Sequence, residues 1–235
     1  MASAGEDGSQ FDCSKEEMDK LVAEVIRYVL FKTHQNSGCP IKREELTQIV
    51  TRNYHNRSLP AAVINEARQK FSSIFGYELK ELQRSRPSST AQPRSSQQSV
   101  ADARSYILVS QLPAAVYKKY VEDGTKAHLT SLTFVVIGIV HLAGGKISEE
   151  TLWHHLKKLG LHENDENHAE FGNAKQALEA LVQQRYLQKD KVVGPEGSVI
   201  FYELAERALD ASVSGKIKEY ISQIVRSDLP SEDVA

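Results

Sequence analysis

The stretch Ile41-Lys42-Arg43-Glu44-Glu45-Leu46 returns in outline at Ile147-Ser148-Glu149-Glu150-Thr151-Leu152, and both stretches share the frame Ile-x-x-Glu-x-Leu. In each case an apolar helical run precedes the frame, and a second helical run and a β-like segment follow it. A recurring order of this kind predicts two copies of one small module. Tandem modules that combine helices with a hairpin usually bind other molecules, so we expect a binding protein rather than an enzyme.

Size and charge agree with two modules. The chain has 235 residues, which is room for two domains of about 100 residues with a modest core each. Apolar residues make up 40% and charged residues 26% of the chain, as in an ordinary globular protein. The formal net charge of -2 argues against a generally basic protein that coats nucleic acid. Any DNA contact would need a local basic patch.

The cysteines, the N-terminus and the most apolar run bear on the compartment. Cys13 and Cys39 have no paired spacing, which excludes a disulfide framework or a CxxC zinc site and is typical of a reducing environment. Residues 1–12 are acidic, small and polar, unlike a signal or transit peptide. The run 129–142 is shorter than the roughly 20 apolar residues that span a bilayer. We therefore expect a soluble intracellular protein without membrane contact.

The first module is predicted over residues 16–112, after a disordered tail at residues 1–15. Apolar residues spaced i, i+3, i+4 from Leu21 to Leu30 indicate an amphipathic helix. A short strand is expected at Ile41, and a second helix begins near Lys42.

A third helix of this module begins near Pro60, a residue favoured in the first helical turn, and ends at Gly76. Its core face carries Val63, Ile64, Ala67, Phe71, Ile74 and Phe75. The alternating run 77–83 and the β-rich run 106–112 then form a hairpin. Helix, short strand, helix, helix and hairpin is the order of a winged helix.

Residues 84–104 are rich in Ser, Gln, Pro and Arg and show no apolar periodicity, so we expect a flexible segment. The segment is either an enlarged wing inside the first module or a true linker between domains. In the first case, the connector between the modules is the stretch 113–128.

The second module is predicted over residues 129–226, followed by a disordered tail at 227–235. Ser148 is a good helix N-cap, with Thr151 in the first turn. The helix faces are expected at Leu152, Trp153, Leu156 and Leu159, then at Ala174, Ala177, Leu178, Leu181 and Val182, and finally at Leu209, Val213, Ile217, Tyr220, Ile221 and Ile224. The runs 186–193 and 198–204 flank a Gly194-Pro195-Glu196-Gly197 turn and are predicted to form a wing hairpin. The expected fold class is mainly α with small β-hairpins, arranged as tandem winged-helix domains.

The helix predicted at 129–142 is apolar nearly all round, so a single core cannot cover it. Either a protein partner or the first module covers its second side. Both possibilities stay open at this point.

The third helix of a DNA-reading winged helix commonly enters the major groove and needs Arg, Lys, Asn or Gln on its outer face. Here the outer faces hold Asn65, Glu66, Gln69, Ser72 and Ser73 in the first module, and Gln176, Glu179, Ala180, Gln183 and Gln184 in the second. Neither face carries a cation, so the electrostatic contribution to DNA affinity should be small.

Residual DNA contact is expected at a cluster of Lys175, Arg185, Lys189 and Lys191, near the ends of the last predicted reading helix and on the second wing. The alternative is that these side chains form a solvated surface. Either way, a stand-alone sequence-specific transcription factor is not favoured.

Catalytic and metal sites are not predicted. His154, His155, His162 and His168 lack an H-E-x-x-H pattern or a cysteine partner, so we expect exposed histidines, with no metal and no cofactor. No catalytic set of nucleophile and base stands out. Ser96-Gln97 and Ser110-Gln111 fit the Ser-Gln pattern of checkpoint kinases, a dipeptide that is frequent by chance.

Several stretches together resemble the MAGE homology domain, from about residue 19 to residue 225. They are Pro40-Ile41-Lys42-Arg43-Glu44-Glu45-Leu46, Phe75-Gly76-Tyr77-Glu78-Leu79-Lys80-Glu81-Leu82, Tyr106-Ile107-Leu108-Val109, Gly144-Gly145-Lys146-Ile147, Glu149-Glu150-Thr151-Leu152-Trp153 and Leu181-Val182-Gln183-Gln184-Arg185-Tyr186-Leu187. Their order and spacing carry the resemblance.

The resemblance implies a tandem winged helix that acts as an adaptor for a RING-type E3 ubiquitin ligase. Short tails favour the branch of the family found as the non-SMC element three subunit of the SMC five/six complex, which joins a RING subunit and a kleisin subunit and reaches SMC proteins indirectly. Many members have adjacent leucines, associated with ligase binding, where this chain has Leu132-Thr133. We expect a partner-binding surface at Leu129, Leu132, Thr133 and Val136, with RING contacts that differ in detail.

The function expected from these observations is a non-catalytic scaffold of a chromosome-maintenance and DNA-repair complex in the nucleus, with weak, sequence-independent DNA contact. The alternatives are a winged-helix transcription regulator and a RING ligase adaptor outside any chromosome complex.

Overall fold

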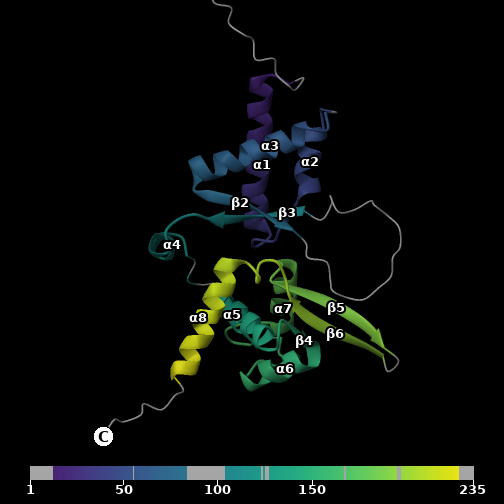
Figure 1. The fold of residues 1–235 in the computed structure, drawn as a ribbon, viewed down its shortest axis with the longest axis vertical. Coiled ribbons are helices and arrows are strands. Elements are labelled where there is room, and N and C mark those ends of the chain that lie inside the picture. The colour runs from purple at the N-terminus through teal and green to yellow at the C-terminus, as the bar shows by residue number, and fades with distance from the viewer. Residues whose placement is uncertain are drawn as a thin grey trace, which may run out of the picture. The chain divides into compact units, whose positions relative to one another are not determined.

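The computed structural model describes residues 13–54, 56–83, 104–122, 124, 127–166, 168–194 and 197–227. The chain divides into two compact units, Met1–Val121 and Glu122–Ala235. Each unit consists mostly of helices with one small antiparallel sheet (Figure 1). The prediction of a mainly α fold with small β-hairpins is confirmed at this level.

The first unit follows the predicted order of elements. Helix α1 (Lys15–Gln35) is followed by β1 (Ile41–Lys42), α2 (Arg43–Thr51), α3 (Leu59–Lys70), a π-helical turn η1 (Phe71–Phe75), β2 (Tyr77–Gln83), β3 (Arg104–Ser110) and α4 (Ala114–Tyr120). The sheet order is β1-β3-β2, with both pairs antiparallel.

The second unit repeats this order. Helix α5 (Ala127–Leu142) is followed by β4 (Lys146–Ser148), α6 (Glu149–Lys158), α7 (Ala174–Gln183), β5 (Leu187–Gly194), β6 (Gly197–Leu204) and α8 (Ala211–Ser227). The sheet order β4-β6-β5 is the same as in the first unit. The long β5–β6 hairpin projects away from the helices of its unit (Figure 1).

The repeated frame occupies the same structural position twice. Ile41 lies opposite Tyr106 in the first sheet, and Ile147 lies opposite Tyr202 in the second. All four side chains are buried. The frame therefore places a short strand against a central strand and begins the next helix, which accounts for its recurrence.

We expected residues 13–15 to belong to a disordered tail, and this prediction is wrong. Cys13 is buried in the first core, and the Ser14 hydroxyl accepts a hydrogen bond from the backbone N–H of Glu17. The Glu17 carboxylate in turn accepts one from the Ser14 N–H. This reciprocal capping box satisfies backbone donors at the start of α1, so the helix begins at Lys15.

The end of the third helix differs from a regular α-helical pattern. Phe71 is buried, as predicted, but Ile74 and Phe75, which we placed on the core face, are exposed. The chain forms a π-helical turn here, whose i→i+5 hydrogen bonds widen the turn and rotate the later residues away from the core. Gly76 ends this turn in the left-handed conformation, at φ 66°, and its role as helix terminator is confirmed.

Two boundaries near the end of the first unit also differ. Strand β3 begins at Arg104 rather than Tyr106, because Arg104 and Ser105 pair with Gln83 and Leu82 of β2. Helix α4 occupies part of the stretch 113–128 that we had treated only as a connector. Its side chains are exposed, so no buried apolar face marks it in the sequence pattern.

Helix α5 is covered on two sides by its own unit. Leu132, Val136 and Val140 belong to the main core of the second unit. On the other side, Ile137 packs with Ile217 of α8 in a smaller cluster. The second cover is therefore α8, which neither of the two sequence-based alternatives had named.

Some predicted features lie outside the described residues. They are the tail at 1–12, most of the Ser/Pro/Arg segment (84–103), the first Ser-Gln dipeptide, the centre of the Gly194–Gly197 turn and the tail at 228–235. Within the described part of the chain, the structure has no helix with the length and apolar character needed to cross a bilayer.

Candidate functional site

Lys189 on β5 is the centre of an ion-pair network rather than a free cation. Its Nζ donates to Glu179 Oε1 at 2.8 Å and lies 3.5 Å from Glu149 Oε1. It also lies 5.4 Å from the ring centroid of Tyr202, the residue opposite it in β6, and the Tyr202 hydroxyl donates to the same Glu149 oxygen at 3.1 Å. Lys189 thus has its charge balanced by carboxylates from α6 and α7.

The contacts within this network shift the pKa values of Lys189 and Tyr202. Burial alone would lower the pKa of Lys189, but hydrogen bonds to Glu179 and Tyr202 and the charge of Glu149 outweigh burial and raise that pKa. Burial raises the pKa of Tyr202, Lys189 lowers it and Glu149 raises it, and together these effects raise the pKa of Tyr202 to about 12. Lys189 stays protonated under all ordinary conditions.

Arg185 is held by a carboxylate as well. Its Nη2 lies 2.6 Å from Glu206 Oε1, and the Glu206 side chain is only 8% exposed. Arg185 has φ 65°, and the N–H groups of Arg185 and Tyr186 donate to the carbonyls of Val182 and Leu181. This is a Schellman end of α7 with arginine at the position where glycine is usual. The ion pair and the helix end fix this side chain.

Lys175 and Lys191 complete the predicted cluster. Lys175 is exposed and lies 3.4 Å from Glu163 Oε1. Lys191 is exposed on β5, and within the described ranges no carboxylate pairs with it. Of the four cations expected to contact DNA, three are therefore bound to carboxylates in their own unit, and Lys191 is the most available.

The third helices present the polar outer faces that their sequences predict. Asn65, Gln69, Ser72 and Ser73 are exposed in the first unit, and Gln176 and Gln183 are exposed in the second. Glu179, predicted only as an outward-facing acid, is the partner of Lys189. The sequence holds no signal for that contact, because the two residues meet only through the packing of α7 on β5.

The four residues expected at a partner surface fall into two groups. Leu132 and Val136 are buried in the main core of the second unit, so a partner could reach them only by opening that core. Leu129 is 41% exposed, and the Thr133 hydroxyl donates to the Leu129 carbonyl at 2.7 Å. Leu129 and Thr133 remain at or near the surface.

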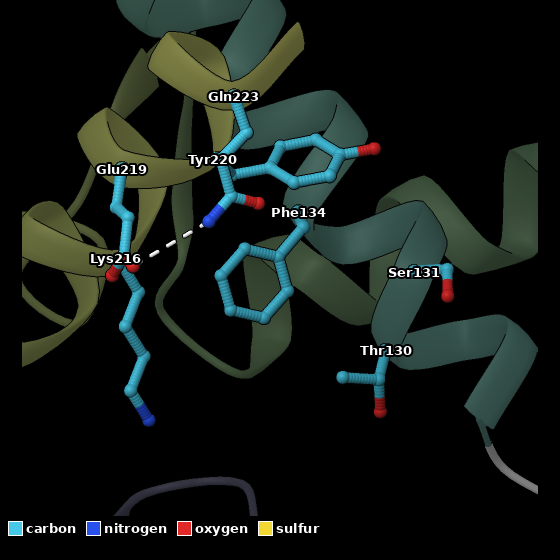
Figure 2. A pocket seen from close by; sticks show the side chains of 7 residues that line it. All are labelled: Thr130, Ser131, Phe134, Lys216, Glu219, Tyr220 and Gln223. Atoms are coloured by element: carbon cyan, nitrogen blue, oxygen red, sulfur yellow. Dashed lines mark hydrogen bonds between the residues drawn. The ribbon is translucent and has the colours of Figure 1, made fainter. Parts of the chain in front are cut away.

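A shallow groove of about 360 Å³ lies between α5 and α8, and its α5 wall is formed by residues next to Leu129 and Thr133 in the sequence. Figure 2 shows its lining of Thr130, Ser131 and Phe134 from α5 and Lys216, Glu219, Tyr220 and Gln223 from α8. Gln223 Nε2 donates to Glu219 Oε1 at 3.5 Å across one turn of α8. The lining combines two aromatic rings with polar groups, a composition suited to a protein contact.

The histidines do not gather into a site. His154, His155 and His162 are exposed, whereas His168 is half-buried and its Nδ1 accepts hydrogen bonds from the N–H groups of Glu170 and Phe171. Among the residues that the structure describes, no group of three or more His, Cys, Asp or Glu side chains could hold a metal ion.

Comparison with known sequences identifies a family. The model of the MAGE homology domain matches residues 25–211. The mouse "Non-structural maintenance of chromosomes element 3 homolog" is 26% identical over 192 residues, which cover 81% of this chain and 60% of that protein. The human "Melanoma-associated antigen 8" is 25% identical over 220 residues, 92% of this chain and 62% of that protein. The chain thus spans about three fifths of the length of these relatives.

Comparison with solved structures supports the fold. A chain of the structure named "Nse1-Nse3-Nse4 complex" superposes with a TM-score of 0.72 and is 23% identical, over 91% of this chain and 92% of that chain. At this identity the likeness concerns the fold.

Proposed function

Because this chain belongs to the MAGE family, we propose that it is a non-catalytic scaffold of two winged-helix modules in a chromosome-maintenance and DNA-repair complex of the nucleus. In that complex it holds a RING-type ubiquitin ligase subunit and a kleisin subunit, and reaches the SMC proteins through them. The observation that carries the proposal is the match of 91% of the chain to a chain of the "Nse1-Nse3-Nse4 complex". The sequence likeness to the mouse element 3 homolog supports the same assignment.

The winged-helix assignment rests on the order of elements. Each unit has helix, short strand, helix, helix and hairpin, and the first short strand pairs with the second strand of the hairpin. In such a fold the third helix would be the DNA-reading element. Here α3 and α7 expose amides, the turn η1 exposes the hydroxyls of Ser72 and Ser73, and the nearby cations Lys70, Lys175 and Lys189 are paired with carboxylates.

Weak, sequence-independent DNA contact is the role that these charges allow. Each phosphate contact contributes by counterion release, so a surface whose cations are already paired gains little. Lys191 on the second hairpin is the most available of the four residues proposed for this contact, and Lys175 follows, since its partner Glu163 is an exposed loop residue. A sequence-specific transcription regulator is therefore disfavoured.

Protein partners are proposed to bind where the second unit leaves apolar or aromatic atoms exposed. Leu129 and Thr133 keep their proposed role, Tyr220 adds an exposed ring on the α8 wall of the groove, and Ile224 is a further exposed apolar side chain of α8. Leu132 and Val136 would act indirectly, by holding α5 in place from within the core.

Co-purification tests the proposal directly. The tagged full-length chain, recovered from nuclear extract at moderate salt, should bring down a RING protein, a kleisin and SMC subunits in constant ratio. A Leu129→Asp variant should lose at least one of these partners, whereas an exposed Lys157→Asp variant on α6 should keep all of them. Recovery of SMC subunits without a RING protein or a kleisin would contradict the proposal.

A second candidate is a ubiquitin-ligase adaptor outside any chromosome complex. The likeness to the human "Melanoma-associated antigen 8", over 92% of the chain, favours it. Recovery of a RING ligase without SMC or kleisin subunits in the same experiment would select this candidate.

A further inference from the structure

The first unit contains a hollow lined by arginines between α3 and the β2–β3 hairpin. Its volume is about 250 Å³. The polar side chains around it are Arg43 from the first position of α2, Asn65 and Arg68 from α3, Glu81 from β2, and Arg104 and Tyr106 from β3. Three separate elements, α2, α3 and β3, thus bring three guanidinium groups to one place.

The positive charge of this hollow exceeds what Glu81 can balance. Arg104 Nε lies 3.3 Å from Glu81 Oε1, and Arg68 Nη2 lies 3.7 Å from Glu81 Oε2. Arg43 is paired with no carboxylate in the described part of the chain. One carboxylate therefore faces three guanidinium groups, which leaves two positive charges uncompensated.

Hydrogen-bonding capacity is also unused. Arg68 Nε is a buried donor without a hydrogen-bond partner, whereas the acceptor Glu81 Oε1 has only its ion pair with Arg104. Buried donors in native proteins are normally satisfied, so a group of this kind needs an explanation. The cluster also affects the pKa of Tyr106. Burial and then Glu81 raise the pKa of its phenol, Arg43, Arg68 and Arg104 lower it, and the net effect is a raised pKa. A bound anion would balance the excess positive charge and accept a hydrogen bond from Arg68 Nε.

The second unit shows what a closed version of the same position looks like. Glu81 lies opposite Tyr106, and Lys189 lies opposite Tyr202 in the corresponding strand pair. Arg43 stands two residues after the Ile of the repeated frame, where the second unit has Glu149. The charges are inverted, but in the second unit the central Lys189 is fully engaged by Glu149 and Glu179. At this position the first unit therefore has more cations than carboxylates, whereas Lys189 of the second unit is balanced by two glutamates.

We propose that this hollow binds phosphate, and that its occupant is a phosphorylated serine or threonine side chain of a partner peptide. Guanidinium groups present paired N–H donors that match the oxygens of phosphate, and arginine clusters are a recurring means of recognising phosphorylated peptides. A phosphomonoester carries about -1.5 to -2 charges near neutral pH, which corresponds to the uncompensated charge of the cluster.

A phosphodiester of nucleic acid fits this position less well. The backbone continues on both sides of each phosphate, so DNA affinity requires several neighbouring cations. Beside the hollow, the exposed face of α3 offers Asn65 and Gln69, and Lys70 is paired with Asp19 and Glu66. The hollow suits one phosphate group, and the described part of α3 beside it offers no unpaired lysine to the next phosphate of a nucleic-acid backbone.

Binding is tested with the isolated full-length chain and three probes. They are inorganic phosphate, a fluorescein-labelled Gly-Ala decapeptide with one central phosphoserine, and the same peptide with serine. The phosphoserine peptide should bind at least tenfold more tightly than the serine peptide, and inorganic phosphate should compete with it. Equal binding of the two peptides would overturn the proposal.

Variants locate the binding to the hollow. Arg43→Gln should weaken phosphoserine binding about tenfold, as expected for the loss of one charge-assisted contact, without loss of circular dichroism. Arg27→Gln, an exposed cation of α1, is the matched control and should leave binding unchanged. Glu81→Gln removes the competing carboxylate and should tighten binding severalfold. Equal effects of Arg43→Gln and Arg27→Gln, or weaker binding in Glu81→Gln with its fold intact, would overturn the assignment.

A 20-base-pair DNA fragment provides the last comparison. If Arg43→Gln weakens binding of this fragment and leaves the phosphoserine peptide unaffected, the occupant is a nucleic-acid backbone and the peptide assignment is overturned. The experiment needs no other subunit, so its outcome is independent of whether the chain assembles with a RING protein and a kleisin.

Discussion

Replacement of Ile217 by alanine tests whether α8 is an integral cover of α5. Ile217 is 1% exposed and packs with Ile137, which is 2% exposed, and with Ala208. If a partner protein rather than α8 normally covered this side of α5, the contact would matter little in the isolated chain. If α8 is the cover, its loss should destabilise the second unit on its own.

The expected loss follows from the atoms removed. The change from isoleucine to alanine deletes three buried carbons, which corresponds to about 2.4 kcal/mol at about 0.8 kcal/mol per methylene. The cavity left behind adds to this value. Since Phe134 and Val213 at the edge of the cluster are only partly buried and can relax into the space, we expect a total of about 3 kcal/mol.

Urea unfolding followed by tryptophan fluorescence measures the effect in the relevant unit. Trp153 is the single tryptophan of the chain and packs against the main core of the second unit. The midpoint should fall by about 1–2 M urea. The control Leu129→Ala, at a 41% exposed position of the same helix pair, should change stability by no more than about 0.5 kcal/mol. Equal effects of the two variants, or an unchanged midpoint for Ile217→Ala, would refute the argument.

Three other predictions concern polar contacts. Arg185→Ala should destabilise the second unit by about 1–3 kcal/mol, because it leaves Glu206 buried without its partner. Arg185→Gly should be about 1 kcal/mol more stable than Arg185→Ala, because glycine adopts the left-handed conformation without strain. The reverse order of stabilities in urea unfolding would refute the role of the backbone. Lys191→Gln should reduce the slope of log DNA affinity against log salt by about 1, and Lys189→Gln should reduce it by clearly less. Equal slopes for the two variants would show that the ion pairs of Lys189 do not prevent it from contacting a phosphate. Partial burial alone would raise the pKa of Glu45, but hydrogen bonds from Tyr28 and the Lys42 N–H and the charge of Lys32 outweigh burial and lower that pKa. The stabilisation by Glu45 is therefore present above the carboxyl's unfolded pKa of about 4.3 and is lost as the pH falls through the lowered folded value. Glu45→Gln should therefore lower stability by about 0.5–1 kcal/mol at pH 7, a value reduced by solvent screening, and by almost nothing at pH 2; a difference that persists unchanged in acid would contradict this linkage.

Periodicity predicted the helices and strands because it reports local burial. The spacing from Leu21 to Val29 marks the buried face of α1, and the frame at Ile41 and Ile147 marks the short strands of both sheets. Ser148 was predicted as an N-cap, and its hydroxyl accepts from the Thr151 N–H at 3.1 Å. The prediction that Ile74 is buried was wrong because it assumed the α-helical period of 3.6 residues, whereas the chain forms a π-helical turn at Phe71–Phe75.

The candidate sites were harder to predict because they depend on distant partners. The sequence shows Lys189 as a wing lysine, and the structure pairs it with carboxylates 10 and 40 positions earlier in the chain, on Glu179 and Glu149. A lysine that is free and a lysine that is paired have the same local pattern. The prediction of a basic patch therefore overestimated the charge available at these residues, and their contact with DNA stays a prediction.

The sequence by itself determined the repeated order of helix, strand, helix, helix and hairpin, because burial periodicity, caps and turn residues act over a few neighbouring positions. Only the tertiary structure decided which charged side chains form ion pairs and which keep an unbalanced charge. The strand registers place Glu81 opposite Tyr106 and Lys189 opposite Tyr202. Packing of the neighbouring elements then surrounds Glu81 with arginines and Lys189 with glutamates. Coulomb interactions depend on these distances in space, which no local pattern records.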